Sequence, residues 1–503
     1  MTDQLILSID QGTTSSRTVL FDKTGSCVHV SQKEIKQYYP EEGWVEHDAM
    51  EILESVKTCL QAARDYAQGH DASIIVAGLT NQRETIVLWE RASGKPLHPA
   101  IVWQDRRTTS ACDDLRQAGR QGLNVDEESL QQRTGLFFDP YFSASKLAWL
   151  LDHVPGARNR AEQGELAAGT IDTFLCWHLL KRSEGKAQHV SDVTNASRTS
   201  LMNLESLAWD QELLELFAVP QAVLPEIRPS TNFYGELSIV DVPLCAVIGD
   251  QQSAAVGQAC IKPGMLKSTY GTGCFVLANT GERPLFSSHR LLTTVAYQAR
   301  GELAYALEGS LFNAGSAIQW LRDELQLIDT AKEVEALAER AASDSLVTMV
   351  PAFSGLGAPA WNPRARAAFF GLTRSSGPAE MCLATLQAIA WQTRDLLDCM
   401  EADGLAIETM RVDGGMTANA LFVRLLAERC ALAIDQPEEL ECTALGAALL
   451  AFAEWQGKPL ASITQQWRLK ARIAPTSDLS ALAEERLRWR KATEAVAVFS
   501  ART

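Results

Sequence analysis

The chain opens with two apolar stretches separated by a short polar segment. Leu5–Ile9 is mostly aliphatic, and β-forming residues return at Thr18–Phe21. Gly12 gives the intervening segment the backbone freedom of a tight turn, so this pattern predicts a β-hairpin. Further strands are predicted at Val28–Ser31, Ser73–Leu79, Thr85–Trp89 and Ala100–Trp103.

Helical periodicity appears between these strands. Asp48 has the character of a helix N-cap, and Glu51 follows three residues later, as in a capping box. Apolar residues then recur at helical spacing and predict one buried face, made of Leu53, Val56, Leu60, Ala63 and Ala67. Helical stretches are predicted to dominate residues 108–181, around a loop at residues 135–141.

The second half of the chain repeats this construction in pattern, although only weakly in its letters. Leu244–Ile248 has the character of a buried strand that runs into Gly249–Gln252. Met265–Tyr270 and Cys274–Ala278 are strand-like and flank the turn Gly271–Gly273, as in the first hairpin. We therefore expect an N-terminal lobe of residues 1–255 and a C-terminal lobe of residues 256–503, with the boundary near residues 253–262.

The remaining C-terminal elements continue the alternation of helices and strands. Helices are predicted at Ser310–Ile328 and Glu380–Ala402, a strand at Thr409–Val412, and Arg-, Glu- and Ala-rich helix at the end. The strand at Thr409–Val412 feeds the turn Gly414–Gly415. This alternation predicts an α/β fold.

Composition and charge narrow the function classes. The 503 residues are 46% hydrophobic and 21% charged, an ordinary globular composition for two large lobes or about three domains. A net charge of −16 argues against nucleic acid or anionic membrane as a partner, because both bind basic surfaces. The eleven cysteines include no C-x-x-C pair, which is typical of free thiols in a reducing compartment. With no signal-peptide pattern and no membrane-spanning apolar run, we expect a cytoplasmic protein.

A cluster of hydroxyl groups marks the first turn as a candidate phosphate site. Thr13–Ser16 carries four consecutive hydroxyl side chains, with Asp10 before them and Arg17 after them. Such a turn offers N–H and O–H donors to phosphate oxygens, and the arginine adds a charged fork. Asp10 can hold a hydrated Mg²⁺ through its waters. An ordinary turn with solvated Thr and Ser side chains remains the alternative for this stretch alone.

Familiar nucleotide-binding motifs are absent from the sequence or stand out of context. No G-x-x-x-x-G-K-[ST] occurs, and neither do the H-R-D and D-F-G motifs of protein kinases. Gly355–Ala360 fits G-x-G-x-x-A, but Trp361–Pro363 follows where a helix should begin, so we interpret it as a loop. The eight histidines have no metal-ligand spacing, and a structural role is expected for His47. A phosphate site must therefore be built from the two hairpins and the Gly414–Gly415 turn.

Several stretches in a fixed order resemble the FGGY family of carbohydrate kinases, within the sugar-kinase/Hsp70/actin ATPase superfamily. These stretches are Asp10–Arg17, Gly43–Asp48, Thr80–Thr85, Ile101–Thr108, Asp139–Ser143, Lys146–Trp149, Gly249–Gln252, Tyr270–Phe275, Gln319–Asp323 and Val412–Gly415. The resemblance covers residues 4–455 and is most specific to the members that phosphorylate glycerol. Any one stretch could arise by accident, whereas the ordered set could not plausibly do so.

The resemblance implies a fold and an activity. The fold would be two actin-like, ribonuclease H-like lobes, with helices flanking mixed sheets and the active-site cleft between the lobes. The activity would be direct in-line transfer from ATP with Mg²⁺ to glycerol, giving sn-glycerol 3-phosphate in glycerol catabolism, while lobe closure excludes water. A homo-oligomer, dimer or tetramer, is also implied. Two alternatives stay open: a kinase of this fold that acts on another small polyol or ketose, and a non-catalytic or chaperone-type ATPase.

The same resemblance assigns residues to the acceptor. Glycerol carries only hydroxyl groups on three carbons, so its recognition needs charged hydrogen-bonding groups and an apolar wall. The hydroxyls would be bound by Arg83, Glu84, Tyr141, Asp250 and Gln251, and the wall formed by Trp103 and Phe275. A surface ion pair and core aromatic residues are the plainer alternatives when each residue is taken alone.

Asp250 is the expected general base. It is expected to end a buried strand, where it can accept the proton of the attacking hydroxyl, and a weak base suffices for a largely dissociative phosphoryl transfer. Asp10 would orient the waters of Mg²⁺. Phosphate contacts are expected from Thr13, Thr14, Ser15, Arg17 and Thr272, and adenosine contacts from Gly315, Gln319, Gly415 and Asn419.

Two departures from the family pattern carry expectations of their own. Residues 234–243 are short and lack the Gly- and Arg-containing loop by which some bacterial members bind fructose 1,6-bisphosphate. We therefore predict that this sugar bisphosphate does not inhibit. Ala360 and Asn362 replace the Tyr and Asp that are usual around the family's Trp-Asp-Pro segment, which bears on local loop contacts and not on the chemistry.

Overall fold

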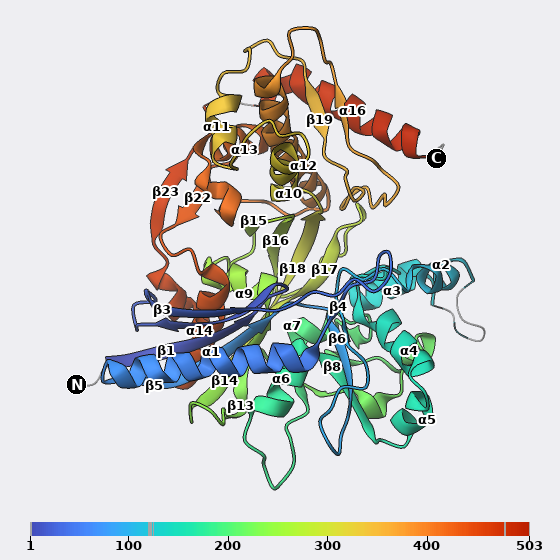
Figure 1. Cartoon of the computed structure of the whole chain (residues 1–503), viewed down its shortest axis with the longest axis vertical. Coiled ribbons are helices and arrows are strands. Elements are labelled where there is room, and N and C mark those ends of the chain that lie inside the picture. The colour runs from blue at the N-terminus through green and yellow to red at the C-terminus, as the bar shows by residue number, and fades with distance from the viewer. Residues whose placement is uncertain (1–2, 119–122, 124, 477–478, 502–503) are drawn as a thin grey trace.

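Two mixed β-sheets flanked by helices organise the chain (Figure 1). The computed structural model describes residues 3–118, 123, 125–476 and 479–501. The blue-to-cyan elements form the lower part of Figure 1, and most of the orange and red elements form the upper part. The predicted α/β fold with mixed sheets is confirmed.

The first sheet contains the predicted hairpin. Its strands, in order, are β13 (Thr231–Glu236), β14 (Pro243–Gly249), β5 (Ala72–Asn81), β1 (Asp3–Gln11), β2 (Ser15–Phe21) and β3 (Cys27–Glu34). β1 and β2 are antiparallel, and Gln11 lies opposite Ser16, so residues 12–14 make the turn. β5 pairs in parallel with both β1 and β14, so three carboxyl ends reach the same edge of the sheet.

The second sheet contains the second predicted hairpin. Its strands, in order, are β17 (Leu292–Ala299), β18 (Glu302–Leu311), β16 (Cys274–Gly281), β15 (Met265–Tyr270), β21 (Thr409–Asp413), β22 (Ile434–Pro437) and β23 (Leu469–Ile473). β15 and β16 are antiparallel around residues 271–273, as predicted. β15 also pairs in parallel with β21, which brings Thr269 opposite Asp413.

A four-stranded antiparallel sheet accompanies the first sheet. It contains, in order, β4 (Glu46–His47), β7 (Ala100–Ile101), β6 (Ile86–Glu90) and β8 (Leu166–Thr170). β8 lies inside the stretch 108–181 that was expected to be dominated by helices, and the sequence analysis did not identify it. All of its residues are buried, and a fully buried strand has no periodicity that distinguishes it from a buried helix. Residues 119–122 and 124 of that stretch lie outside the described residues.

Helices cover the sheets. In the first part of the chain they are α1 (Ala49–Gly69), α2 (Thr109–Ala118), α3 (Glu127–Thr134), α4 (Ser143–His153), α5 (Ala157–Glu162), α6 (Ile171–Leu179), α7 (Val193–Ala196), α8 (Gln211–Leu216) and α9 (Asp250–Gly257). In the second part they are α10 (Gly315–Asp323), α11 (Glu333–Ala338), α12 (Pro378–Ala402), α13 (Ala420–Cys430), α14 (Cys442–Gln456), α15 (Leu460–Ile463) and α16 (Ala483–Ala501). Short strand pairs join β9 (Val190–Asp192) to β12 (Glu226–Arg228), β10 (Met202–Asn203) to β11 (Ala208–Trp209), and β19 (Thr348–Val350) to β20 (Ala368–Phe370).

The start of α1 confirms one half of a predicted motif. The Asp48 carboxylate accepts the N–H groups of Met50 and Glu51, as an N-cap should. Glu51 does not complete a capping box, because its carboxylate accepts the N–H of Lys36 in the segment that follows β3. A long-range contact has therefore taken the place of the local one.

Two predictions for the second half are wrong in detail. Ser310 and Leu311 end β18, and the helix predicted from Ser310 to Ile328 is α10 alone. The C-terminal region contains α14 and α16, but β22 and β23 also lie there. β22 and β23 form the edge of the second sheet and pair with strands far away in sequence, which local pattern does not reveal. Residues 477–478 and 502–503 lie outside the described residues.

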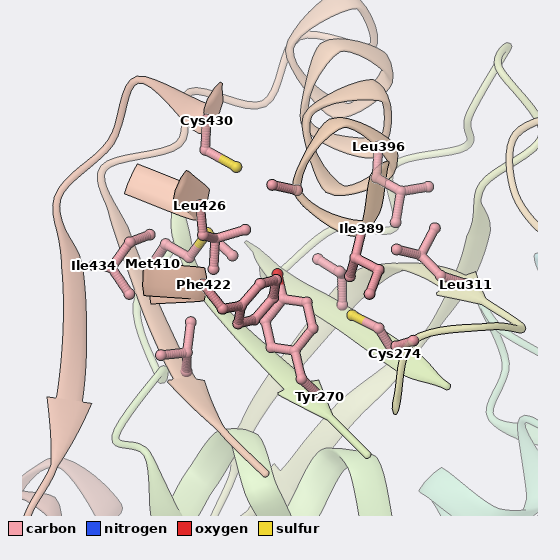
Figure 2. Packing of buried hydrophobic residues seen from close by; sticks show 14 of the residues in the cluster. Tyr270, Cys274, Leu311, Ile389, Leu396, Met410, Phe422, Leu426, Cys430 and Ile434 are labelled. Carbon is pink, nitrogen blue, oxygen red and sulfur yellow. The ribbon is translucent and has the colours of Figure 1, made fainter. Parts of the chain in front are cut away.

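The core of the second half forms where α12 and α13 cover the second sheet. Figure 2 shows Tyr270 and Phe422 at its centre, and their ring centroids lie 5.0 Å apart in an edge-to-face arrangement. Leu426 and Met410 lie on one side of this pair, and Ile389 on the other. The Tyr270 hydroxyl forms a hydrogen bond with Thr393, so its polar atom is satisfied inside the core.

α14 joins the two halves. Although it comes late in the sequence, it packs on β1, β5 and β14 of the first sheet and on α9, and Figure 1 shows it beside the blue strands. Gly78 on β5 allows this approach, because a Cβ there would lie 2.2 Å from the carbonyl oxygen of Ala447. Gly446 on α14 similarly faces the carbonyl oxygen of Ser253 on α9. Close backbone contact therefore fixes the crossing of α9 and α14.

All eleven cysteines are free thiols. His47 is buried, and burial lowers its pKa to about 4, which suits the expected structural role of a neutral imidazole. No helix in the described part of the chain has the length and apolarity needed to cross a bilayer.

Candidate active site

Three parallel strands deliver their carboxyl ends to one place in the first sheet. Asn81, at the end of β5, lies opposite Gln11 on β1 and Gly249 on β14. Asp10, the pair Arg83–Glu84, and Asp250 therefore lie at or just beyond these ends. In open α/β sheets, ligands bind at this edge. The topology thus brings together the residues that the sequence analysis assigned to the acceptor and to catalysis.

Arg83 is the centre of the acceptor residues. Its side chain is buried, and its guanidinium group contacts several residues. Nη1 donates to Glu308 Oε2 at 2.6 Å, and Nε lies 3.4 Å from Asp250 Oδ1. Nη2 is 3.5 Å from the Tyr141 hydroxyl. Burial alone would lower the pKa of Arg83, but Glu308 and Glu84 raise it well above its usual range. Arg83 is therefore a permanent cation inside the protein.

Glu84 has an unusual backbone. Its φ is 60°, the left-handed region that a residue of this size rarely adopts. Its carboxylate accepts from Arg198 Nε at 2.6 Å, and its carbonyl oxygen accepts from the Ser143 hydroxyl. Strained backbone of this kind persists where surrounding contacts impose it, and it gathers at functional sites.

Asp250 begins α9 directly after β14, so it opens a helix instead of ending the strand. The preceding N–H, that of Gly249, is held by the Thr194 hydroxyl at 2.9 Å. Burial raises the pKa of Asp250 to about 6; Glu84 and Asp10 also raise it, whereas Arg83 and Lys267 lower it. A carboxyl group with this pKa is ionised at neutral pH and is a stronger base than an exposed aspartate.

Gln251, the next residue, is held by a buried lysine. Lys267 on β15 donates to Gln251 Oε1 and to the Thr269 hydroxyl. Burial lowers the pKa of Lys267, and Asp413 and Asp250 oppose this effect. Since the lysine comes from the second sheet and Gln251 from the helix after the first, this bond crosses between the two halves.

Trp103 packs against Tyr141 and against Phe275, so aromatic rings from both halves of the chain meet here. The Trp103 ring lies 5.7 Å from that of Tyr141 and 6.1 Å from that of Phe275 on β16, both edge to face. Trp103 Nε1 also donates to the Thr13 hydroxyl at 3.0 Å. The aromatic wall is thus tied directly to the first hairpin turn.

The first hairpin turn presents part of its hydroxyl cluster to solvent. Thr14 is exposed, and the Ser15 hydroxyl accepts from Gln32 Nε2. Arg17 forms ion pairs with Asp10 at 2.5 Å and with Glu441, in the loop before α14, at 2.7 Å. Burial alone would lower the pKa of Arg17, but these two carboxylates raise it. Both terminal nitrogens of its guanidinium group therefore have a carboxylate partner in this structure, which the sequence alone did not indicate.

The second hairpin turn is tied to the start of α10. Thr272 is exposed, and its carbonyl oxygen accepts the N–H groups of Ala314 and Ser316. Gly315 lies against the same turn: a Cβ there would be 2.6 Å from the carbonyl oxygen of Gly271. Gln319 follows one helical turn later and is exposed.

The predicted turn after β21 lies beside these groups. Gly414 has a φ of 92° and packs on the backbone of Tyr270, so a side chain at this position would clash. At Gly415 no described atom lies within 4 Å of an added Cβ, so this backbone is open to a ligand. Asn419 caps α13 by accepting the N–H of Phe422, which gives it a structural task besides the expected contact with adenosine. The four adenosine residues stay predictions.

Sequence reasoning missed three buried charged residues that bond to predicted acceptor side chains. Arg198 follows α7, Glu308 lies on β18, and Lys267 lies on β15; all three side chains are buried. The only signal in the sequence is a single charge inside an otherwise apolar or small-residue stretch, as in Ala304–Leu311. A charge in such a strand must find a partner, but the partner is remote in sequence.

Known proteins resemble this chain over most of its length. The FGGY family of carbohydrate kinases matches through its N-terminal domain at residues 5–257 and its C-terminal domain at residues 266–455. A glycerol kinase of Alcanivorax borkumensis is 54% identical and covers 93% of this chain and 94% of its own. A glycerol kinase of Geobacillus kaustophilus is 47% identical, covering 99% of this chain and 100% of its own. The crystal structure of Plasmodium falciparum glycerol kinase with ADP superimposes with a TM-score of 0.91 at 34% identity, covering 98% of both chains.

Proposed function

The chain belongs to the FGGY family of carbohydrate kinases, and from this premise we propose that it transfers the terminal phosphoryl group of ATP to glycerol. The observation that carries the proposal is the convergence of Arg83, Glu84 and Asp250 beside an aromatic wall that both halves of the chain build. Relatives with about half of their residues identical are glycerol kinases. The product would be sn-glycerol 3-phosphate.

The acceptor site suits a small polyol. Arg83, Glu84, Tyr141, Asp250 and Gln251 offer both donors and acceptors within a few ångströms of one another. Trp103 and Phe275 supply the apolar surface for the C–H edge of the acceptor. Because buried polar groups left without partners are costly, such a site discriminates strongly for a ligand that presents hydroxyl groups in the right places.

Asp250 acts as the general base in this proposal. Its carboxylate accepts the proton of the acceptor hydroxyl as the oxygen attacks the terminal phosphorus in line with the leaving group. The raised pKa, about 6, improves the match between the base and neutral pH. The phosphoryl group passes directly to the acceptor, so no covalent phosphoenzyme forms.

The two hairpin turns hold the triphosphate. Thr13, Thr14, Ser15 and Thr272 donate to phosphate oxygens, and Arg17 adds positive charge. Gly315, Gln319, Gly415 and Asn419 line the adenosine end. Asp10 fits a Mg²⁺ that keeps its waters, because the ion pair with Arg17 uses only Oδ2 and carboxylate oxygens are ligands that this cation prefers. When bound, the metal neutralises charge on the phosphate oxygens.

The test is ADP release measured with glycerol, with a panel of other polyols and ketoses, and without acceptor. We expect turnover that depends on glycerol. Preference for another polyol or a ketose would contradict the proposal in favour of the first alternative, and acceptor-independent ATP turnover would favour the second. A matched pair of variants locates the site: Phe275→Ala should raise the KM for glycerol, whereas Phe233→Ala, an exposed phenylalanine on β13, should not.

The oligomeric state stays a prediction. A dimer or tetramer is expected, and sedimentation velocity over a range of protein concentrations measures it directly. A monomer at all concentrations would contradict the expectation without affecting the proposed chemistry.

A further inference from the structure

Four buried charged side chains form a closed ring behind the acceptor residues. Arg83 Nη1 bonds to Glu308 Oε2 at 2.6 Å, and Glu308 Oε1 bonds to Arg198 Nη2 at 2.9 Å. Arg198 Nε bonds to Glu84 Oε1 at 2.6 Å, and the same oxygen lies 3.9 Å from Arg83 Nε. Positive and negative charges alternate around the ring. Each side chain is at most 2% exposed.

The ring contains two kinds of residue. Arg83 and Glu84 are the residues to which the proposed function gives the acceptor hydroxyls. Arg198 and Glu308 have no such assignment. They also come from different halves of the chain, because Arg198 follows α7 whereas Glu308 lies on β18 of the second sheet. Glu308 is therefore a charged connection from the second sheet to the acceptor residues of the first half.

Arg198 and Glu308 each hold one acceptor residue of the ring and leave part of that residue available. Arg198 occupies Oε1 of Glu84, and Glu308 occupies Nη1 of Arg83. Nη2 of Arg83 then points toward the Tyr141 hydroxyl, and Nε toward Asp250. The guanidinium of Arg198 also lies over the Tyr141 ring, 5.5 Å from its centroid. One pair of side chains thus orients three of the expected acceptor residues.

We propose that Arg198 and Glu308 are positioning residues, which set the orientation of Arg83 and Glu84 and link acceptor binding to the relative placement of the two halves. This inference rests on the proposed function only in taking Arg83 and Glu84 as acceptor ligands. Burying four charges is costly, and a buried ion pair is often no more stabilising than apolar residues of the same volume. The ring is therefore better explained by geometry that the acceptor needs than by stability.

The charges of the ring also affect Asp250 through Arg83. The groups that face Asp250 are Arg83, Glu84, Lys267 and Asp10. Removing the negative charge of Glu308 leaves Arg83 free to turn toward Asp250, which lowers the pKa of that carboxyl group. Removing the positive charge of Arg198 has the opposite effect. The two changes should therefore move the acid limb of the pH–rate profile in opposite directions.

The experiment compares Arg198→Gln and Glu308→Gln with the wild type, using the best acceptor that the wild type accepts from the polyol and ketose panel. We expect the acceptor KM to rise roughly tenfold to a hundredfold in each variant, with the KM for ATP nearly unchanged. The acid limb of kcat/KM should shift to lower pH in Glu308→Gln and to higher pH in Arg198→Gln. Glu454→Gln is the matched control, because it breaks a half-exposed ion pair with Arg300 outside the site and should change none of these values.

The double variant Arg198→Met/Glu308→Met separates positioning from stability. It removes one charge of each sign, so the remaining ion pair of Arg83 and Glu84 has no net charge. Urea unfolding should therefore give a free energy of unfolding close to that of the wild type. The acceptor KM should nevertheless stay high. Recovery of the wild-type KM in the double variant, or single variants with wild-type KM and pH profile, would overturn the proposal.

The proposed function can fail separately. A wild type that ignores glycerol but phosphorylates another acceptor contradicts the proposed substrate, and the ring is then tested with that acceptor. A wild type without any acceptor in the panel overturns both proposals, because Arg83 and Glu84 then bind none.

Discussion

Replacing Asp250 with asparagine should lower turnover and, at neutral or higher pH, raise the free energy of unfolding. The variant keeps the size of the side chain and an oxygen that can accept from Arg83 Nε, 3.4 Å away in the wild type, but loses the basic carboxylate. A general base contributes about 10²- to 10⁴-fold to a rate, so turnover should fall by that order. Binding of the nucleotide, which the variant does not touch, should persist.

The effect on stability follows from the raised pKa. Folding raises the pKa of Asp250 from 3.8 to about 6, so the folded protein holds the proton more tightly than the unfolded chain. The ionisation of this carboxyl group therefore leaves the free energy of unfolding unchanged below pH 3.8. It lowers that free energy as the pH rises from 3.8 to 6, and by a constant amount above pH 6. A shift of about two pKa units corresponds to about 3 kcal/mol. Because 27% of the side chain is exposed and solvent screens it, we expect about 1 to 2 kcal/mol.

Asp250→Asn should therefore be more stable than the wild type at pH 8, and the difference should be much smaller near pH 4. Urea unfolding at the two pH values measures the free energies, a coupled ADP-release assay measures turnover, and calorimetric titration measures nucleotide binding. Asp65→Asn, an exposed carboxylate on α1, is the control that should change neither quantity. Turnover within tenfold of the wild type would refute the base assignment, and a variant less stable at pH 8 would refute the charge-burial argument.

Three further predictions concern the aromatic wall, the adenosine end of the site and inhibition by a sugar bisphosphate. Trp103→Phe keeps the wall but loses the hydrogen bond to the first hairpin, so the KM values for both substrates should rise severalfold in initial-rate assays; a change in one alone would contradict the link. Gly315→Ala places a methyl group 2.6 Å from the carbonyl oxygen of Gly271, so we expect a loss of about 1 to 3 kcal/mol in urea unfolding and weaker ATP binding; Gly69→Ala, where no described atom lies within 4 Å, should cost nothing. Fructose 1,6-bisphosphate at millimolar concentration should leave initial rates unchanged, because residues 234–243 lack the loop that the family resemblance associates with its binding; inhibition would contradict this prediction.

The hairpins could be predicted from the sequence because their signals are local, whereas the acceptor residues were assigned through the family resemblance and stay predictions. The turn at residues 12–14 follows from a glycine and hydroxyl residues between two β-forming runs, and it forms where expected. Asp250 stands at the end of a recognisable buried strand, and only its assignment to the strand needed correction. Motif order along the chain then identified the family.

The remaining parts depend on contacts between distant segments. Glu308 lies in a strand whose end the sequence analysis assigned to a helix, and its partners Arg83 and Arg198 are more than 100 residues away. Arg17 forms ion pairs with Glu441 and Asp10 that no local pattern reveals, and its contact with phosphate stays a prediction. Buried charges are placed by tertiary structure, so sequence periodicity cannot identify their partners.

The position of α14 in the sequence determines when the first sheet can be completed during synthesis. The first sheet has all of its strands once residue 249 has been synthesised, yet the helix that covers β1, β5 and β14 ends at residue 456. At a translation rate of about 5 to 20 residues per second, the exit of that helix from the ribosome follows about 10 to 40 seconds later. During this interval the sheet exposes an apolar face to the surrounding solution. A nascent chain of this length is thus an expected client of chaperones that shield apolar surfaces until synthesis is nearly complete.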